Sequence, residues 1–217
     1  MDRPTLFVVD DNPGIRRSLR SLGESVGLAV EAYSSSEEFL GAYDAQQLGC
    51  LILDVRLAGG RNGLDLQDEL RRRGALLPII VMTAYATVPT TVRTFKAGAF
   101  DFLRKPANPK KLLERVHAAI DAHRQALEVE RRHTEIRGRL HRLSPRERQV
   151  TELLIDGKTS KEIATALGLS VRTVEGHRRM IMTKMEISSV TRLIRDLVSA
   201  TAHVARTQGK RGEGPST

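Results

Sequence analysis

Five short apolar segments alternate with amphipathic stretches through residue 120, and this alternation limits the possible fold more than any other feature of the 217-residue chain. Apolar segments this short are typical of buried strands. Strands are expected at residues 6–10, 28–33, 50–54, 79–83 and 100–103, and helices at residues 13–25, 36–46, 63–73, 88–97 and from Asn108 onward. Because strands that alternate with helices build βαβ units, we predict an α/β, doubly wound parallel sheet with strand order 2-1-3-4-5.

Only helical signals follow residue 142. Ser144 and Glu147 have the spacing of a capping box, with Pro145 at the first helical position. Three more helices are expected over "TSKEIATALGLS", "VRTVEGHRRMIMTKM" and "SVTRLIRDLVSATA", which predicts an all-α four-helix domain. The predicted boundaries are 1–122 for the α/β domain, 123–142 for a helical linker, 143–203 for the helical domain and 204–217 for a disordered tail.

The predicted linker contains the charged run "EVERRHTEIRGRLHR", which has little apolar surface. We interpret it as an extension of the last helix of the α/β domain. Its charges suit a solvated helical face, and they also suit a coiled coil that forms a dimer. The heptad signal covers too few turns to choose between these two interpretations.

Positive charge is concentrated in the second part of the chain. Residues 1–120 carry 16 Lys and Arg against 14 Asp and Glu, whereas residues 121–217 carry 19 against 12. A basic second part predicts contact with a polyanion such as nucleic acid. A basic surface that is merely solvated is the alternative.

The sequence argues against a membrane protein and against a secreted one. No apolar run approaches the ~18 residues that a membrane span requires, and the N-terminus lacks the features of a secretory signal. The single cysteine, Cys50, provides no disulfide framework, and its apolar neighbours predict a buried side chain. We therefore expect a cytoplasmic protein with no membrane partner.

Polar side chains stand at or beside the carboxyl ends of four predicted strands, namely Asp10, Asp11, Asp54, Thr83 and Lys105. Ligands of open parallel sheets bind at this edge. Neighbouring carboxylates repel unless a cation joins them, and oxygen ligands of this kind are selected by Mg²⁺. The pattern predicts a magnesium site, although Asp10 and Asp11 could instead serve only to cap the next helix.

The same residues suit phosphoryl transfer. A carboxylate can attack phosphorus and form an aspartyl phosphate, and Asp54, on the central strand, is the predicted nucleophile. The phosphoryl oxygens need a positive charge and a hydroxyl group around them, which Lys105 and Thr83 are expected to supply.

The segments "FVVDDN", "LILDVR", "VMTA" and "FLRKP" resemble those of response-regulator receiver domains, the CheY-like, flavodoxin-like (βα)5 fold of two-component signalling, over residues 4–122. The resemblance implies that Asp54 accepts a phosphoryl group from the phosphohistidine of a sensor histidine kinase. It implies Mg²⁺ ligands from Asp10, Asp11, Asp54 and the backbone carbonyl of Arg56. It also implies a switch pair, Thr83 and Phe102, that changes conformation on phosphorylation.

This chain departs from the receiver pattern in the loop after Asp54. It has Leu57 and Ala58 where Met-Pro is usual, and the loop before Gly63 is one residue longer. The difference concerns the loop geometry beside the predicted phosphoacceptor.

The segment "SKEIATALGLSVRTVEGHRRMI" has the layout of a helix-turn-helix, in which the second helix enters the major groove of DNA. Ile163, Ala164, Leu167, Val171 and Val174 are expected to form the core between its helices. The predicted DNA-binding residues are Lys158, Lys161, Arg172, Thr173, Glu175, Gly176, His177, Arg178, Arg179 and Lys184. Arg and Glu can contact base edges, and the lysines are expected to contact phosphates. A helical bundle with exposed arginines is the alternative.

The segments "LSPRERQV", "GKTSKEIA" and "LGLSVRTVEGHR" resemble the LuxR-type DNA-binding domain of the NarL/FixJ family over residues 144–200. The resemblance implies double-stranded promoter DNA as a partner. It also implies a homodimer when the protein is phosphorylated, with Leu193, Leu197 and Val198 of the fourth helix at the dimer interface. Gly176 departs from the aliphatic residue that is common at its position.

Three functional hypotheses follow. The first is a transcriptional regulator, not an enzyme, whose DNA binding or dimerisation is switched by phosphorylation of Asp54. The second is a metal-dependent phosphatase that uses the same carboxylates. The third is a regulator that binds DNA without phosphorylation and uses its first domain to dimerise.

Overall fold

A computed structural model describes residues 3–57, 62–84, 87–189 and 191–195. The chain divides into two compact units, with the division after Glu128. The predicted domain boundaries at residues 122, 142 and 203 are not tested by this division and stay a prediction. Each unit is described by itself.

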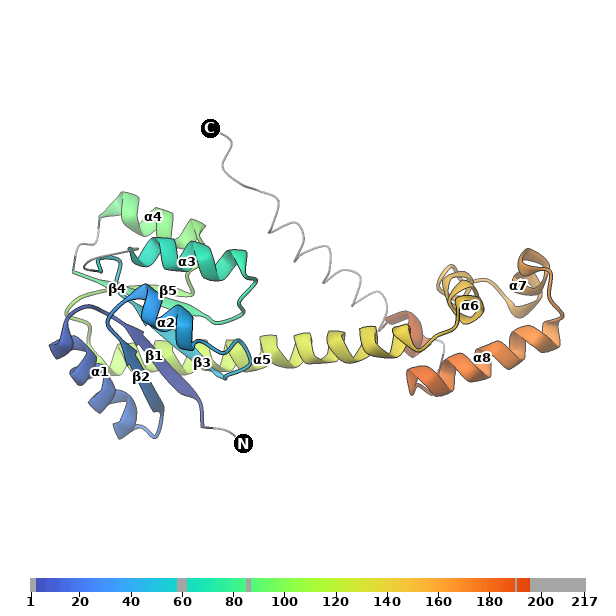
Figure 1. The fold of residues 1–217 in the computed structure, drawn as a ribbon, viewed down its shortest axis with the longest axis horizontal. Helices are drawn as coiled ribbons and strands as arrows, with labels where there is room; N and C mark the ends of the chain where they lie inside the picture. Colours follow the sequence, from blue (N-terminus) through green and yellow to red (C-terminus); the bar gives the residue numbers. More distant parts are fainter. Residues whose placement is uncertain (1–2, 58–61, 85–86, 190, 196–217) are drawn as a thin grey trace. The chain divides into compact units, whose positions relative to one another are not determined.

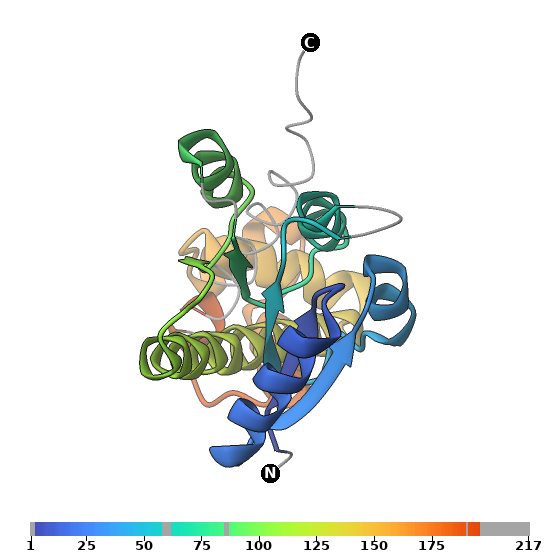
Figure 2. The same ribbon diagram turned by 90° about the vertical axis from the view of Figure 1, so that its left-hand side faces the viewer.

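The first unit contains a parallel five-stranded sheet in the order β2-β1-β3-β4-β5, which confirms the predicted topology. Its strands are Thr5–Val9 (β1), Ala29–Tyr33 (β2), Gly49–Leu53 (β3), Ile79–Thr83 (β4) and Asp101–Arg104 (β5). Its helices are Pro13–Ser25 (α1), Ser36–Ala42 (α2), Gly63–Arg72 (α3), Val88–Lys96 (α4) and the first part of Pro109–His141 (α5). Helices cover both faces of the sheet (Figures 1 and 2).

Burial on both faces explains why the strands are continuous apolar runs rather than alternating ones. Side chains on a strand point to opposite faces in turn. Leu6 and Val8 of β1 therefore join the core under α1 and α5, whereas Phe7 and Val9 join the core under α2 and α3. Cys50 is fully buried as predicted, and burial raises the pKa of its thiol to about 12.

The first and third strands end one residue earlier than the sequence pattern indicates. Asp10 and Asp54 therefore lie just beyond β1 and β3 rather than inside them. The reason is local, because each carboxylate accepts a hydrogen bond from a backbone N–H two residues later, and this starts a turn. The donors are Asn12 for Asp10 (2.9 Å) and Arg56 for Asp54 (3.2 Å).

The second unit is helical in its described residues. It contains Pro145–Ile155 (α6), Ser160–Leu167 (α7) and Val171–Met185 (α8). The predicted capping box joins Ser144 to Glu147 at the start of α6, and Thr159 and Glu162 form another at the start of α7. Gly168 ends α7 with a φ of 64°, a left-handed conformation that glycine adopts without steric cost.

The core of the second unit contains Val150, Leu154, Ile163, Val174, Ile181 and Met185. Val171 does not belong to it, and its side chain is 43% exposed, so the prediction for this residue is wrong. Helical spacing does place Val171 on the same side as Val174. However, Val171 is the first residue of α8, where the buried face of the helix only begins.

Helix α5 continues without interruption through the segment predicted as a linker, as far as His141. Val116 and Ile120 pack against the sheet, and Ile136 belongs to the core of the second unit. Ion pairs of its own residues stabilise the charged run, among them Arg131–Glu135 and Arg137–Glu130, both at 2.8 Å. These ion pairs are consistent with a solvated helical face. The alternative interpretation, a coiled coil that forms a dimer, is not tested.

The predicted fourth helix is described only through residue 195, and Leu193 is the one predicted dimer residue within that part. Leu193 is fully buried in the core of its own unit. In this structure its side chain therefore supports the fold of the helical unit, and a dimer contact stays a prediction. Leu197 and Val198 lie outside the described residues.

Candidate functional site

Three carboxylates meet at the carboxyl edge of the sheet. Asp10 and Asp11 follow β1, and Asp54 follows the neighbouring strand β3. One oxygen atom from each carboxylate lies within 4.8 Å of the others. Asp10 and Asp54 are buried, at 2% and 9% exposed, whereas Asp11 is exposed. Oxygen ligands gathered this closely, with one side open to solvent, fit a divalent cation such as Mg²⁺.

Lys105, just beyond β5, reaches into the same cluster. Its Nζ donates hydrogen bonds to Asp10 Oδ2 and to Asp54 Oδ2, both at 2.5 Å. Burial alone would lower the pKa of Lys105, but these hydrogen bonds and the two negative charges outweigh it and raise that pKa above its ordinary value. The ammonium therefore stays charged and offsets part of the repulsion between the carboxylates. The Lys105–Pro106 peptide bond that follows is cis.

Arg16, on α1, stabilises the loop that carries Asp10 and Asp11, a role that the sequence analysis did not predict. Its Nη1 donates to the backbone carbonyls of Asp10 and Asp11, at 2.6 and 2.9 Å. Asn12 caps α1 by accepting from two backbone N–H groups of the first turn. The loop that carries the two carboxylates is thus held on both sides. The sequence signal for Arg16 is weak, because Arg17 and Arg20 lie on the same helix.

Gly63 is a second residue that the sequence analysis missed. Its N–H donates to the carbonyl of Val55 at 2.9 Å, which places the start of α3 against the loop after Asp54. A Cβ atom added at Gly63 would lie 2.0 Å from the backbone oxygen of Asp54. Only glycine allows this approach, so Gly63 helps to determine where the Asp54 backbone lies.

The predicted switch residues are both close to this edge of the sheet. Thr83 ends β4, is 1% exposed, and its carbonyl accepts from the N–H of Lys105 at 2.9 Å. Phe102, on β5, is half-buried and packs against the core under α2 and α3. Arg56 is exposed. The switch and the carbonyl ligand stay predictions.

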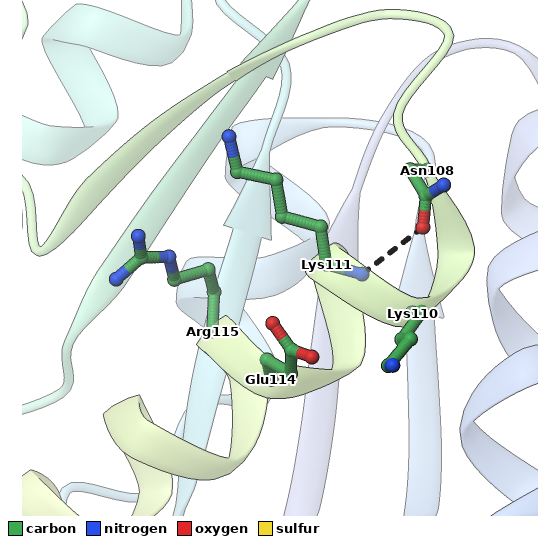
Figure 3. A pocket seen from close by; sticks show the side chains of 5 residues that line it. All are labelled: Asn108, Lys110, Lys111, Glu114 and Arg115. Carbon is green, nitrogen blue, oxygen red and sulfur yellow. Dashed lines mark hydrogen bonds between the residues drawn. The ribbon is translucent and has the colours of Figure 1, made fainter.

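A shallow pocket at the start of α5 shares no residue with the carboxylate cluster (Figure 3). It is lined by exposed residues, namely Asn108, Lys110, Lys111, Glu114 and Arg115. Asn108 accepts a hydrogen bond from the N–H of Lys111 at 3.2 Å, which caps the helix. None of the predicted phosphoryl-transfer residues lines this pocket, so it adds no group to the candidate site.

The second unit contains the predicted helix-turn-helix, formed by α7, the turn at residues 168–170 and α8. The predicted DNA-binding residues differ in exposure. The exposed ones are Lys158, Lys161, Arg172, Thr173, Glu175 and Arg179, and the half-buried ones are Gly176, His177, Arg178 and Lys184. An exposed basic face on the second helix is the arrangement that places side chains against DNA.

Lys184 has a partner inside the helical unit, which the sequence analysis did not predict. Its Nζ donates to both carboxylate oxygens of Glu147, at 2.7 and 2.9 Å. Burial alone would raise the pKa of Glu147, but the hydrogen bonds from Lys184 and Ser144 lower it below the ordinary value. Lys184 thus links α8 to the capping box of α6, and a phosphate contact stays a prediction.

Within the described part of the chain, no helix has the length and apolar character that would let it cross a membrane.

Comparisons with known proteins agree with both units. The model of the response regulator receiver domain matches residues 6–117, and that of the luxR family of bacterial regulatory proteins matches residues 141–197.

Nodulation protein W of Bradyrhizobium diazoefficiens is 42% identical over 190 residues, which cover 88% of this chain and 83% of that protein. The transcriptional regulatory protein FixJ of Azorhizobium caulinodans is also 42% identical, over 88% of this chain and 90% of its own. A solved structure of the response regulator StyR has a TM-score of 0.81 and 35% identity, and covers 90% of this chain and 98% of its own. The chain belongs to the NarL/FixJ family of response regulators, in which a receiver domain precedes a LuxR-type regulatory domain.

Proposed function

We propose that the protein is a transcriptional regulator whose DNA binding or dimerisation is switched when Asp54 accepts a phosphoryl group from a sensor histidine kinase. The observation that carries this proposal is the carboxylate cluster, in which oxygens of Asp10, Asp11 and Asp54 lie within 4.8 Å of one another and Lys105 bonds to two of them. The family consists of transcription regulators rather than enzymes, which disfavours the phosphatase hypothesis.

Asp10, Asp11, Asp54 and the carbonyl of Arg56 would hold the cation, for which Mg²⁺ fits the oxygen ligands. When bound, the ion supplies positive charge that offsets the charge on the phosphoryl oxygens. The other roles in phosphoryl transfer fall to side chains of the protein.

In the phosphoryl transfer, a carboxylate oxygen of Asp54 attacks the phosphorus of the kinase phosphohistidine. The P–O bond forms as the P–N bond breaks, and the imidazole leaves with the electron pair and takes a proton from solvent. Lys105 is already bonded to Asp54, so its ammonium lies where negative charge develops on the phosphoryl group. The hydroxyl of Thr83 can donate to another phosphoryl oxygen.

The phosphoryl group can switch the protein only by binding two conformations of the receiver with different affinity. Thr83 and Phe102 are the residues proposed to differ between these conformations. The response is either a homodimer, with Leu193, Leu197 and Val198 as proposed contacts, or a change in access to the DNA-binding helix. Double-stranded promoter DNA is the proposed partner of α8.

The test is covalent labelling of the full chain with acetyl phosphate and Mg²⁺, read by intact-protein and peptide mass spectrometry. We expect one added phosphoryl group on Asp54 and no label in the Asp54→Asn variant. Asp121→Asn serves as a control, because Asp121 is exposed and its carboxylate accepts a hydrogen bond from Arg124 of its own helix. An adduct of the same yield in Asp54→Asn would refute the assignment of the phosphoacceptor.

A further inference from the structure

A three-residue contact joins the two helices of the helix-turn-helix. Arg178 Nη1 donates to Ser160 Oγ at 2.6 Å, and the hydroxyl of Ser160 donates to Glu175 Oε1. Arg178 and Glu175 also form an ion pair at 3.8 Å on α8. Ser160 is the first residue of α7, so the contact connects the start of one helix to the middle of the next.

An ion pair three residues apart on an exposed helix contributes little by itself. Here the arginine side chain is only 28% exposed, and both charged groups share a hydroxyl on a different helix. Hydrogen bonds to charged groups are stronger than neutral ones, and they have a preferred direction. The contact can therefore hold α8 at a defined rotation and position relative to α7.

Arg178 also points away from the face that Arg172 and Arg179 share. At 100° per residue, Arg179 lies about 20° around the helix from Arg172, whereas Arg178 lies about 120° away, towards the side that carries the buried Val174. Gly176 lies about 40° around the helix from Arg172, on the side away from Arg179, and a Cβ atom there would meet no atom within 4 Å. The face that carries Arg172 and Arg179 is thus basic, with open space beside it.

Glu175 lies near the border of this open face, where an uncompensated carboxylate would repel the phosphates of DNA. Its bonds to Ser160 and Arg178 offset that charge and direct the carboxylate towards α7. The contact therefore reduces repulsion as well as fixing geometry.

We propose that Ser160, Glu175 and Arg178 form a positioning link for the DNA-binding helix, and that sequence reading falls to Arg172 and Arg179 instead of Arg178. This inference rests on the proposed function, because it requires that α8 enters DNA. It changes the roles of two residues, Glu175 and Arg178, that the sequence analysis assigned to direct contact with DNA.

The test is a double-mutant cycle on the full chain, phosphorylated with acetyl phosphate and Mg²⁺, with duplex DNA sites that the chain without substitutions selects from a randomised duplex pool. Arg178→Gln and Ser160→Ala are each expected to weaken binding about five-fold, and the double variant is expected to bind no more weakly than the weaker single variant. Ser160→Asn retains a donor and an acceptor and should restore most of the affinity. Circular dichroism and thermal unfolding check that each variant is folded.

The selected sequence separates positioning from contact. Arg178→Gln should leave the selected sequence unchanged, whereas Arg179→Gln should alter it at one or more positions. Losses that multiply in the double variant, or a changed selected sequence in Arg178→Gln, would overturn the positioning link alone. Failure of the phosphorylated chain without substitutions to select any DNA would overturn the proposed function together with it.

Discussion

The receiver edge and the DNA-binding face both depend on charged side chains, but they organise these charges in opposite ways. At the receiver edge the charges come from positions 10, 54 and 105, are mostly buried, and bond to one another. On α8, Arg172 and Arg179 come from two turns of one helix and are exposed. Transfer of a phosphoryl group needs charges held at fixed positions around the reacting atoms. Attraction to DNA needs only charges that can reach phosphates and bases.

Because of this difference, the two sites should respond differently to salt and to displacement of the backbone. Buried charges are screened little by salt, whereas exposed charges are screened strongly. Buried groups also tolerate little displacement, because their partners cannot follow them. Salt and backbone perturbation are therefore ways to test the contrast between the two units.

The largest expected effect is that of salt. Between about 50 and 200 mM salt, binding to a selected duplex should weaken about 10³-fold, because cations released from DNA must be recovered. Labelling of Asp54 by acetyl phosphate should change less than about three-fold, because the site is buried. The measurements are fluorescence anisotropy with labelled DNA and mass spectrometry. An equally steep loss of labelling would contradict the contrast.

The second-largest expected effect comes from adding a single methyl group beside Asp54. Gly63→Ala should reduce the rate of Asp54 labelling about ten-fold or more and destabilise the receiver by about 1–3 kcal/mol, because the new Cβ atom would overlap the Asp54 backbone oxygen. Gly41→Ala is the matched control, since Gly41 lies in α2 and a Cβ atom there meets nothing within 4 Å.

The control variant should leave labelling unchanged and raise stability slightly, because alanine favours a helix by about 1 kcal/mol relative to glycine. Labelling and denaturant unfolding measure the two properties separately. Equal labelling rates in the two variants would show that the position of the Asp54 backbone does not limit the reaction.

The smallest expected effect concerns pH and the buried His123 of α5. Its Nδ1 lies 3.1 Å from the N–H nitrogen and 2.9 Å from the carbonyl oxygen of Gly49 at the start of β3. Its Nε2 is buried without a hydrogen-bond partner among the described residues. Burial lowers the pKa of His123, although its hydrogen bond to Gly49 opposes this shift.

The lowered pKa of His123 determines the direction in which stability changes with pH. The unfolded chain binds a proton to His123 near its ordinary pKa of 6.5, and the folded chain does so only at lower pH. Its contribution to stability is therefore present above pH 6.5 and is lost as the pH falls below that value. Between pH 7.5 and 5.5 we expect unfolding of the receiver to become easier. His123→Asn should remove most of this dependence in calorimetry, and an unchanged pH dependence would exclude His123 as its source.

Much of the candidate site could be predicted from the sequence because its residues carry local signals. Asp10, Asp11 and Asp54 directly follow apolar strands, and parallel topology brings such strand ends to one edge. Ser144 and Glu147 were predicted from their spacing alone, because a capping box involves only neighbouring residues.

Contacts between distant segments could not be predicted in this way. The partner of Lys184 is Glu147, 37 residues earlier, and nothing in the local pattern distinguishes Lys184 from Lys158 or Lys161. Arg178 resembles Arg179 in the sequence, yet only Arg178 reaches Ser160 in the described contacts. Val171 has the spacing of a core residue but is exposed, because the buried face begins beyond it.

By itself, the amino-acid sequence determined the alternation of strands and helices and the polar residue types that follow the strands. These depend on hydrophobic period and on residue type, which are properties of short segments. Tertiary structure alone decided which arginine is exposed, which lysine is paired inside its unit, and why Gly63 must lack a side chain. These depend on how far two separate segments stand from each other, a distance that local sequence does not encode.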